Sequence, residues 1–230
     1  EAVKDQASRT RVAGRECGNG VLIDHPGGWQ TQYCHLRQGS IRVKPGEQVA
    51  RGTALGLVGL SGKTEFPHLH LTLRRDGEII DPFTGRFMRG GCKGEEVPLW
   101  RAVQPVPYED VALYNAGFSG GPPHIEAIRQ GREEGAQVAA TAPALVLWVD
   151  MFGVQAGDQL RLRITGPDGH AVLEYEQEIE RTQARRFAFA GKRLKGTAWP
   201  AGVYTGLVTL TRALDGRPLT KTLTRRVTVQ

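Results

Sequence analysis

Apolar and polar side chains alternate strictly from His68 to Leu73, and this alternation limits how the chain folds more than any other feature. A period of two residues is that of a β-strand with one buried face. His68 and His70 are two residues apart, so both point to the same face of the predicted strand. One histidine of such a pair can bind a metal while the other contacts a substrate. By itself, a His-x-His pair is also typical of polar residues on the solvated face of a half-buried strand.

Glycines divide the preceding part of the chain into short segments. Residues 18–25 and 29–36 flank a Pro-Gly-Gly sequence and are rich in apolar and aromatic side chains, which predicts a β-hairpin. Residues 43–49 and 52–59 are predicted to form further short strands, because glycine allows tight turns and close packing of the backbone. We therefore expect a compact antiparallel sheet that brings His35, near the end of the hairpin, into one groove with the two histidines of the later strand.

Three patterns occur in order along this region: Tyr-x-His-Leu at residues 33–36, Val-x-x-Gly-x-x-Leu-Gly-x-x-Gly at residues 49–59, and Pro-His-Leu-His at residues 67–70, followed by Asp81 and Pro82. In these patterns roughly residues 17–83 resemble the lysostaphin-type zinc metallopeptidases, which cut peptide cross-links in bacterial cell walls. The resemblance implies a small antiparallel β catalytic domain. It also implies hydrolysis of peptide bonds in peptidoglycan by a zinc-activated water.

The resemblance assigns a role to each of the three histidines. It makes His70 a zinc ligand and places His35 and His68 beside the metal as catalytic residues. An open zinc site polarises an amide carbonyl and lowers the pKa of its bound water, while neighbouring imidazoles move a proton or stabilise the oxyanion. The alternative for His35 is a structural histidine that ends the hairpin.

The chain departs from the family pattern in its zinc ligands. Members of the family bind zinc through a further His and Asp, arranged as His-x-x-x-Asp on strands before the Gly-Asn-Gly sequence, and no such pair is present here. Residues 1–16 are charged and loop-like. Because three protein ligands are the norm for catalytic zinc, we expect the chain alone to bind zinc poorly. The favoured explanation is an upstream segment or separate chain that completes the site.

Two other functions are alternatives to an active peptidase. A catalytically degenerate peptidase-like module would bind peptidoglycan or regulate another wall hydrolase. The glycine-rich hairpins also resemble lipoyl or biotinyl carriers and sugar-phosphotransferase domains, but the corresponding turn lacks the Met-Lys or Asp-Lys signature of carriers.

Four other polar residues are candidates for the missing zinc ligands. We interpret Asp24 and His25 as turn residues, and His124 and His170 as solvent-exposed loop histidines.

Length and composition predict a mostly β chain with two domains. Residues 1–83 form the peptidase-like domain, and residues 84–139 are a connector with short helices, expected at residues 108–114 and within residues 122–137. Residues 140–230 contain short alternating strands separated by turn signals, which predicts a β-sandwich of immunoglobulin or fibronectin type. This second domain contains no recognisable catalytic set, so its expected role is interaction or spacing.

The net charge of +6 favours an anionic partner. No nucleic-acid motif accompanies the dispersed arginines, so an anionic wall polymer or a membrane surface is the better candidate, while solvated strand faces account for most of these residues. Among the three cysteines, Cys17 and Cys34 lie on the two arms of the hairpin and are plausible disulfide partners, with Cys92 free or an alternative partner of Cys34. A disulfide would suit a periplasmic or secreted protein. No secretory signal or membrane-spanning run is visible in the sequence.

Overall fold

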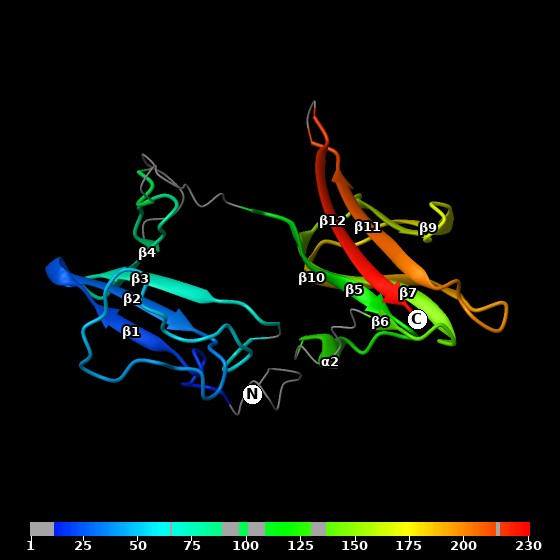
Figure 1. Cartoon of the computed structure of the whole chain (residues 1–230). Helices are drawn as coiled ribbons and strands as arrows, with labels where there is room; N and C mark the ends of the chain where they lie inside the picture. Colours follow the sequence, from blue (N-terminus) through cyan, green and yellow to red (C-terminus); the bar gives the residue numbers. More distant parts are fainter. Residues whose placement is uncertain (1–11, 65, 89–96, 101–108, 130–136, 215–216) are drawn as a thin grey trace. The chain divides into compact units, whose positions relative to one another are not determined.

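The structure of the chain, a computed structural model, describes residues 12–64, 66–88, 97–100, 109–129, 137–214 and 217–230. The chain divides into two compact units, Glu1–Tyr108 and Glu109–Gln230. Strands dominate both units (Figure 1), which confirms the mostly β prediction. In the part of the chain that the structure describes, no helix is long and apolar enough to cross a membrane.

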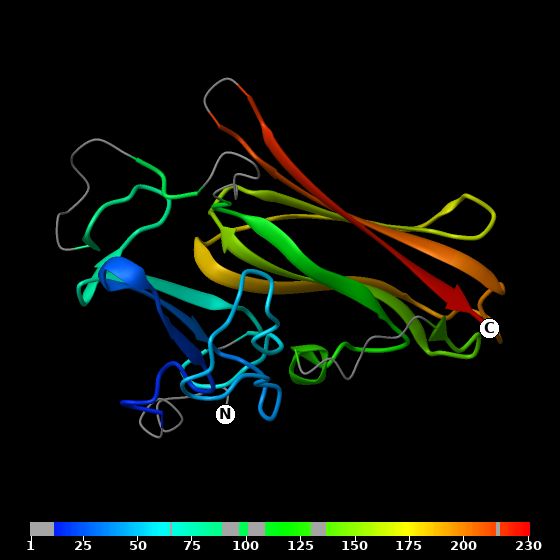
Figure 2. The same cartoon turned by 60° about the vertical axis from the view of Figure 1, so that its left-hand side comes forward.

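The first unit contains one antiparallel sheet with the strand order β1-β2-β3-β4. Its elements are β1 (Val21–Asp24), the short 3-10 helix η1 (Pro26–Gly28), β2 (Trp29–Cys34), β3 (His70–Arg75) and β4 (Glu78–Ile80). Strands β1 and β2 pair from Val21 opposite Tyr33 to Asp24 opposite Gln30, so the predicted hairpin is confirmed. Figure 2 shows the sheet in blue and cyan.

Residues 43–49 and 52–59, which we predicted as strands, are not strands in the structure. This segment is a long loop with turns and makes few strand-like hydrogen bonds. The Arg42 N–H donates to the Leu55 carbonyl. Isolated β-bridges join Leu36 to Val58 and Gly59 to His68. The physical reason is that the turns at residues 45–46 and 51–52 interrupt the backbone before a continuous ladder can form.

The second unit contains two sheets, with strand orders β10-β7-β5 and β6-β12-β11-β8-β9. Its elements are β5 (Ala112–Ser119), α2 (Ile125–Arg129), β6 (Gln137–Val138), β7 (Ala144–Val154), β8 (Gln159–Thr165), β9 (Ala171–Glu178), β10 (Gln183–Arg193), β11 (Gly202–Arg212) and β12 (Leu219–Val229). Neighbouring strands are antiparallel except β12 and β6. The strands expected in residues 140–230 are therefore confirmed.

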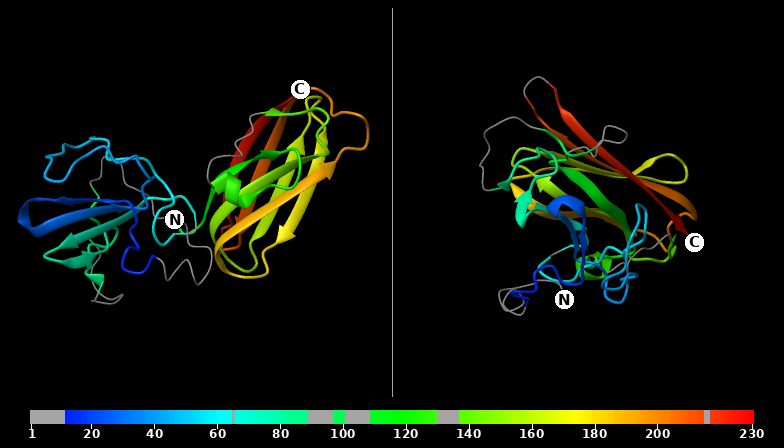
Figure 3. Two further views of the ribbon diagram at one scale, coloured as in Figure 1. Left: turned by 90° about the horizontal axis from the view of Figure 1, so that it is seen from below. Right: turned by 90° about the vertical axis from the view of Figure 1, so that its left-hand side faces the viewer.

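One hydrophobic core lies between the two sheets of the second unit (Figure 3). Leu147 of the smaller sheet and Tyr204 and Val208 of the larger sheet are all almost completely buried in it. A side chain at Gly206 would come 2.6 Å from Leu147 and 2.8 Å from Phe118, so the sheets approach closely there. The β-rich C-terminal region is confirmed, and its immunoglobulin or fibronectin topology stays a prediction.

The predicted helix at residues 108–114 is wrong where the structure describes it, because β5 begins at Ala112 and pairs with β7. Pairing buries Ala116 and Phe118 in the core, and this tertiary contact outweighs local helix propensity. We predicted a connector that extends to residue 139. In the structure the second unit begins earlier, at Glu109. The helical turns expected within residues 122–137 are confirmed by α2.

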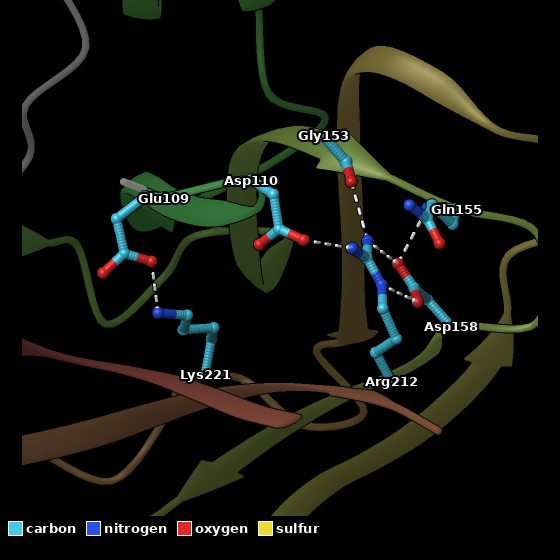
Figure 4. A network of polar contacts seen from close by, with 7 residues as sticks. All are labelled: Glu109, Asp110, Gly153, Gln155, Asp158, Arg212 and Lys221. Carbon is cyan, nitrogen blue, oxygen red and sulfur yellow. Dashed lines mark hydrogen bonds and ion pairs between the residues drawn. The ribbon is translucent and has the colours of Figure 1, made fainter. Parts of the chain in front are cut away.

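A polar network, buried at Arg212 and Asp158, joins the start of the second unit to its core (Figure 4). The Arg212 guanidinium, at the end of β11, is paired with Asp158 and donates to the Gly153 carbonyl. It also pairs with Asp110, while Lys221 pairs with the neighbouring Glu109. The chain is thus fixed by two ion pairs where it enters this unit.

Candidate functional site

Three histidines come together at one end of the sheet in the first unit. His35 directly follows β2, and His70 begins β3 opposite Cys34, while His68 is bridged to Gly59. The ring centroid of His35 lies 4.8 Å from that of His68 and 5.6 Å from that of His70. The predicted convergence of the three imidazoles is therefore confirmed.

His35 is held by two hydrogen bonds to backbone carbonyls. Its ring Nδ1 lies 2.8 Å from the Ser61 carbonyl, and its peptide N–H donates to the Cys17 carbonyl at 2.9 Å. A carbonyl only accepts, so Nδ1 carries the proton and Nε2 keeps its lone pair. His35 also has a φ of 63°, a left-handed conformation that is uncommon outside glycine. The fold therefore fixes both the backbone and the tautomer of this residue.

Burial sets the charge state of His35, whose exposed fraction is 4%. Desolvation lowers the pKa of the imidazole, the hydrogen bond to the Ser61 carbonyl raises it, and the nearby His68 and His70 lower it again. The net result is a pKa below the ordinary value for histidine. At neutral pH His35 is therefore a neutral imidazole with an available Nε2 lone pair.

His68 is oriented in the same way, by a different carbonyl. Its Nδ1 lies 2.9 Å from the Phe66 carbonyl and 3.2 Å from the hydroxyl of the buried Thr64, which itself donates to the Phe66 carbonyl at 2.8 Å. Nε2 of His68 therefore also keeps its lone pair. His70 is exposed, and its Nε2 lies 3.5 Å from the Thr72 hydroxyl, a distance at the limit of a hydrogen bond.

Ser61 connects the histidine segment to the first residues of the sheet. Its buried hydroxyl donates to the Leu36 carbonyl at 2.8 Å and accepts the Asn19 N–H at 2.9 Å, while its own carbonyl accepts the proton of His35. The backbone packs so tightly here that a side chain at Gly62, where φ is 77°, would overlap the Glu16 carbonyl. Sequence reasoning missed Ser61 and Thr64, because a hydroxyl side chain in a loop carries no signal of its hydrogen-bond partners.

A disulfide between Cys17 and Cys34 closes the hairpin beside His35, with the Cα atoms 4.8 Å apart. The predicted pairing of these two cysteines is confirmed. Cys92, the third cysteine, lies outside the described residues. The disulfide joins the residue before His35 to the residue whose carbonyl accepts the His35 peptide N–H, so it restrains the histidine from both directions.

The first unit has relatives among known proteins. Residues 6–82 match peptidase family M23. The matched segment is similar to members of that family. It is 46% identical over 64 residues to the cell division protein DipM of Caulobacter vibrioides and 45% identical over 64 residues to the peptidoglycan DD-endopeptidase ShyA of Vibrio cholerae. It is 35% identical over 68 residues to the protease LasA of Pseudomonas aeruginosa.

The M23 segment is a small part of each protein compared. The aligned residues cover 26–28% of this chain, and they span only 10% of DipM, 14% of ShyA and 16% of LasA. One solved structure, the C-terminal domain of Wzt, aligns with 57% of this chain and 80% of that chain at 8% identity and a TM-score of 0.34.

The described residues of the M23 segment do not by themselves fit a zinc ion. Nowhere in the described ranges do three His, Cys, Asp or Glu side chains form a group that could hold a metal. Asp24 and His25 do not fill the gap, since they are exposed beside η1 and bonded to Gln30 and Thr31. His25 is a turn residue, as predicted. Asp24 is instead the last residue of β1, where it pairs with Gln30. His124 and His170 belong to the second unit and are exposed there, also as predicted.

Proposed function

We propose that this chain hydrolyses peptide bonds in bacterial peptidoglycan, as a cell-wall metallopeptidase of the M23 family. The observation that carries the proposal is the convergence of His35, His68 and His70 in a segment that matches a peptidase family. Relatives of this segment include a protein named as a peptidoglycan DD-endopeptidase. The amide bond of a wall peptide is therefore the proposed substrate.

In the proposed mechanism His35 and His68 move protons and His70 binds the metal. A neutral imidazole with its lone pair on Nε2 can accept a proton and later return it to a leaving amine. Nδ1 of both residues donates to a backbone carbonyl, so each ring is held with Nε2 free for this role. Zinc, when bound, would polarise the amide carbonyl and lower the pKa of a bound water. Its remaining ligands, a His and an Asp, would come from a segment outside this sequence.

The proposed location is the periplasm or the cell exterior. The Cys17–Cys34 disulfide supports it, because disulfides persist in oxidising compartments and are rare in the cytosol. The net charge of +6 supports an anionic wall polymer or membrane surface as a further partner.

A second candidate is a degenerate module that binds peptidoglycan or regulates another hydrolase without cleaving. The observation that favours it is the incomplete ligand set among the described residues. The two functions differ in what happens when a His and an Asp are restored upstream of this chain. A degenerate module would stay inactive, whereas the proposed enzyme would gain activity.

The test measures soluble peptides released from purified peptidoglycan by the extended chain, separated by chromatography and identified by mass. We expect zinc-dependent release that is abolished in His70→Ala and by a chelator. The matched control is His124→Ala, an exposed histidine of the second unit, which should cleave normally. Undiminished cleavage in His70→Ala would remove the metallopeptidase mechanism.

A further inference from the structure

The second unit contains a hollow of about 390 Å³ where the end of β10 meets the start of β7. Its volume is within the range of ligand pockets, roughly 300–1,000 Å³. A side chain at Gly191 would come 2.6 Å from Val146, the paired residue on β7, so glycine lets Val146 pack closely against β10 beside the hollow. Pro122 and Pro143 also line the hollow and give it a rigid apolar wall.

An aromatic ring with an exposed face lines this hollow. Phe189 is 52% exposed, although it is a large apolar residue. Its ring is supported from one side by Phe187, at a centroid distance of 6.2 Å, and Phe187 in turn stacks on the buried Trp148 at 6.0 Å. The ring is therefore held in place by its neighbours while part of its surface stays available. The negative face of an aromatic ring attracts weakly positive C–H groups, such as those of a pyranose ring.

One cation lines the hollow on the same face of β10 as Phe189. Arg193 is four residues after Phe189 and so points to the same face, whereas Lys192 points to the other. Arg193 is exposed and forms no ion pair with any described residue. Arginines elsewhere on the same unit are paired, for example Arg161, which lies 3.3 Å from Glu176. The hollow therefore combines an apolar surface with uncompensated positive charge, and its complement is a ligand with an apolar face and an acidic group.

We infer that this hollow binds an acidic saccharide, specifically a glycan strand that bears carboxylates. The sugar ring would stack on Phe189, and Arg193 would bind the carboxylate. The choice of a wall glycan rests on the proposed function, because peptidoglycan carries carboxylates on its sugars or stem peptides. Single-stranded nucleic acid is disfavoured, since such binding uses a basic groove that follows many phosphates and several stacking rings.

The test measures binding of the full chain to uncross-linked peptidoglycan glycan strands from which the stem peptides have been removed, using isothermal titration calorimetry. Three comparison ligands separate the contributions: a neutral N-acetylglucosamine oligomer, polyglutamate, and a single-stranded DNA oligonucleotide. We expect the acidic glycan to bind at least about fivefold more tightly than each comparison ligand. Equal or tighter binding of any one of the three would overturn the assignment.

Variants at the hollow provide the second part of the test. Phe189→Ser should weaken glycan binding roughly two- to tenfold, and Arg193→Gln should weaken it by a similar factor. Arg161→Gln removes an exposed but paired cation and should leave affinity unchanged. Thermal unfolding confirms that each variant is folded, and unchanged affinity in the first two would contradict the site. Binding retained in His70→Ala separates this result from the outcome of the cleavage test.

Discussion

Replacing Arg212 with methionine should destabilise the second unit strongly. The side chains of Arg212 and Asp158 are only 4% and 1% exposed, and two hydrogen bonds of 2.8 Å join them. Arg212 also donates to the Gly153 carbonyl at 2.7 Å and lies 3.4 Å from Asp110 (Figure 4). Methionine is nearly as long but has no donors, so the Asp158 carboxylate would remain buried without its cation.

The expected loss follows from what Asp158 retains in the variant. Removing one partner of a buried ion pair costs about 3–5 kcal/mol. The N–H of Gln155 still donates to Asp158 at 2.8 Å, so we expect a value near the lower end, about 3 kcal/mol. For a domain of this size the midpoint of thermal unfolding should fall by roughly 12 °C. The double variant Arg212→Met with Asp158→Leu should recover most of the loss, because no charge is left buried.

Urea unfolding followed by tryptophan fluorescence measures these changes, since Trp148 is buried in this unit. The control is Arg161→Met, which breaks an exposed pair with Glu176 and should cost at most about 1 kcal/mol. A loss below about 1 kcal/mol in Arg212→Met, or a double variant no more stable than the single one, would refute the reasoning.

The same pair predicts how stability depends on pH. Burial alone would raise the pKa of Asp158, but the hydrogen bonds from Arg212 and the Gln155 N–H outweigh burial and leave the pKa below its ordinary value. The folded state therefore binds this proton less readily than the unfolded chain, whose Asp pKa is about 3.9. The contribution to stability is present above that pH and is lost as pH falls through the folded pKa. This acid-induced loss should be smaller in Arg212→Met.

Three further predictions concern the first unit. Ser61→Ala removes two hydrogen bonds of a buried hydroxyl, so it should destabilise this unit by about 1–3 kcal/mol in urea unfolding. The His35 tautomer should persist in ¹⁵N NMR because alanine keeps the carbonyl that accepts from Nδ1. Ser61→Thr keeps a hydroxyl and should retain the stability, and unfolding unchanged in the alanine variant would contradict the role of the hydroxyl. The chain as given should bind zinc poorly, since His70 is its only assigned ligand, and elemental analysis that finds a tightly bound equimolar ion would show that ligands were missed. Replacing Cys17 and Cys34 by serine opens a 17-residue loop and should cost this unit about 3 kcal/mol in urea unfolding, and unfolding unaffected by the change would argue against a stabilising disulfide.

The sequence predicts the strands in which apolar and polar residues alternate because one face of the strand is buried. The strands of the second unit follow this rule, as in β8, where Leu160, Leu162 and Ile164 are buried and the intervening residues are not. The sequence mispredicts β5 as a helix, because Gly117 resembles a residue that ends a helix. In the structure Gly117 is part of a strand and packs against the Trp148 ring. A contact with a residue so distant in the chain leaves no local pattern.

The three histidines of the site could be predicted, but the means of holding them could not. Their positions followed from motifs in the sequence, whereas their tautomers depend on the carbonyls of Ser61 and Phe66. Every residue has a carbonyl, so the sequence gives no sign of which one a ring will meet. The path of the loop before His68 determines which carbonyl each ring meets. Glycines such as Gly62 make that path possible.

The two units are stabilised in different ways, and this difference matters for the site. Every residue of the hydrophobic core cluster found among the described residues lies at Val111 or later, in the second unit. In the first unit His35 is restrained instead by the disulfide at Cys34, by backbone hydrogen bonds and by the Ser61 hydroxyl. Such restraints are directional and local, so they fix the orientation of a ring without requiring a large buried volume. The geometry of the site should therefore be far more sensitive to loss of one hydroxyl or one disulfide than to core substitutions in the second unit.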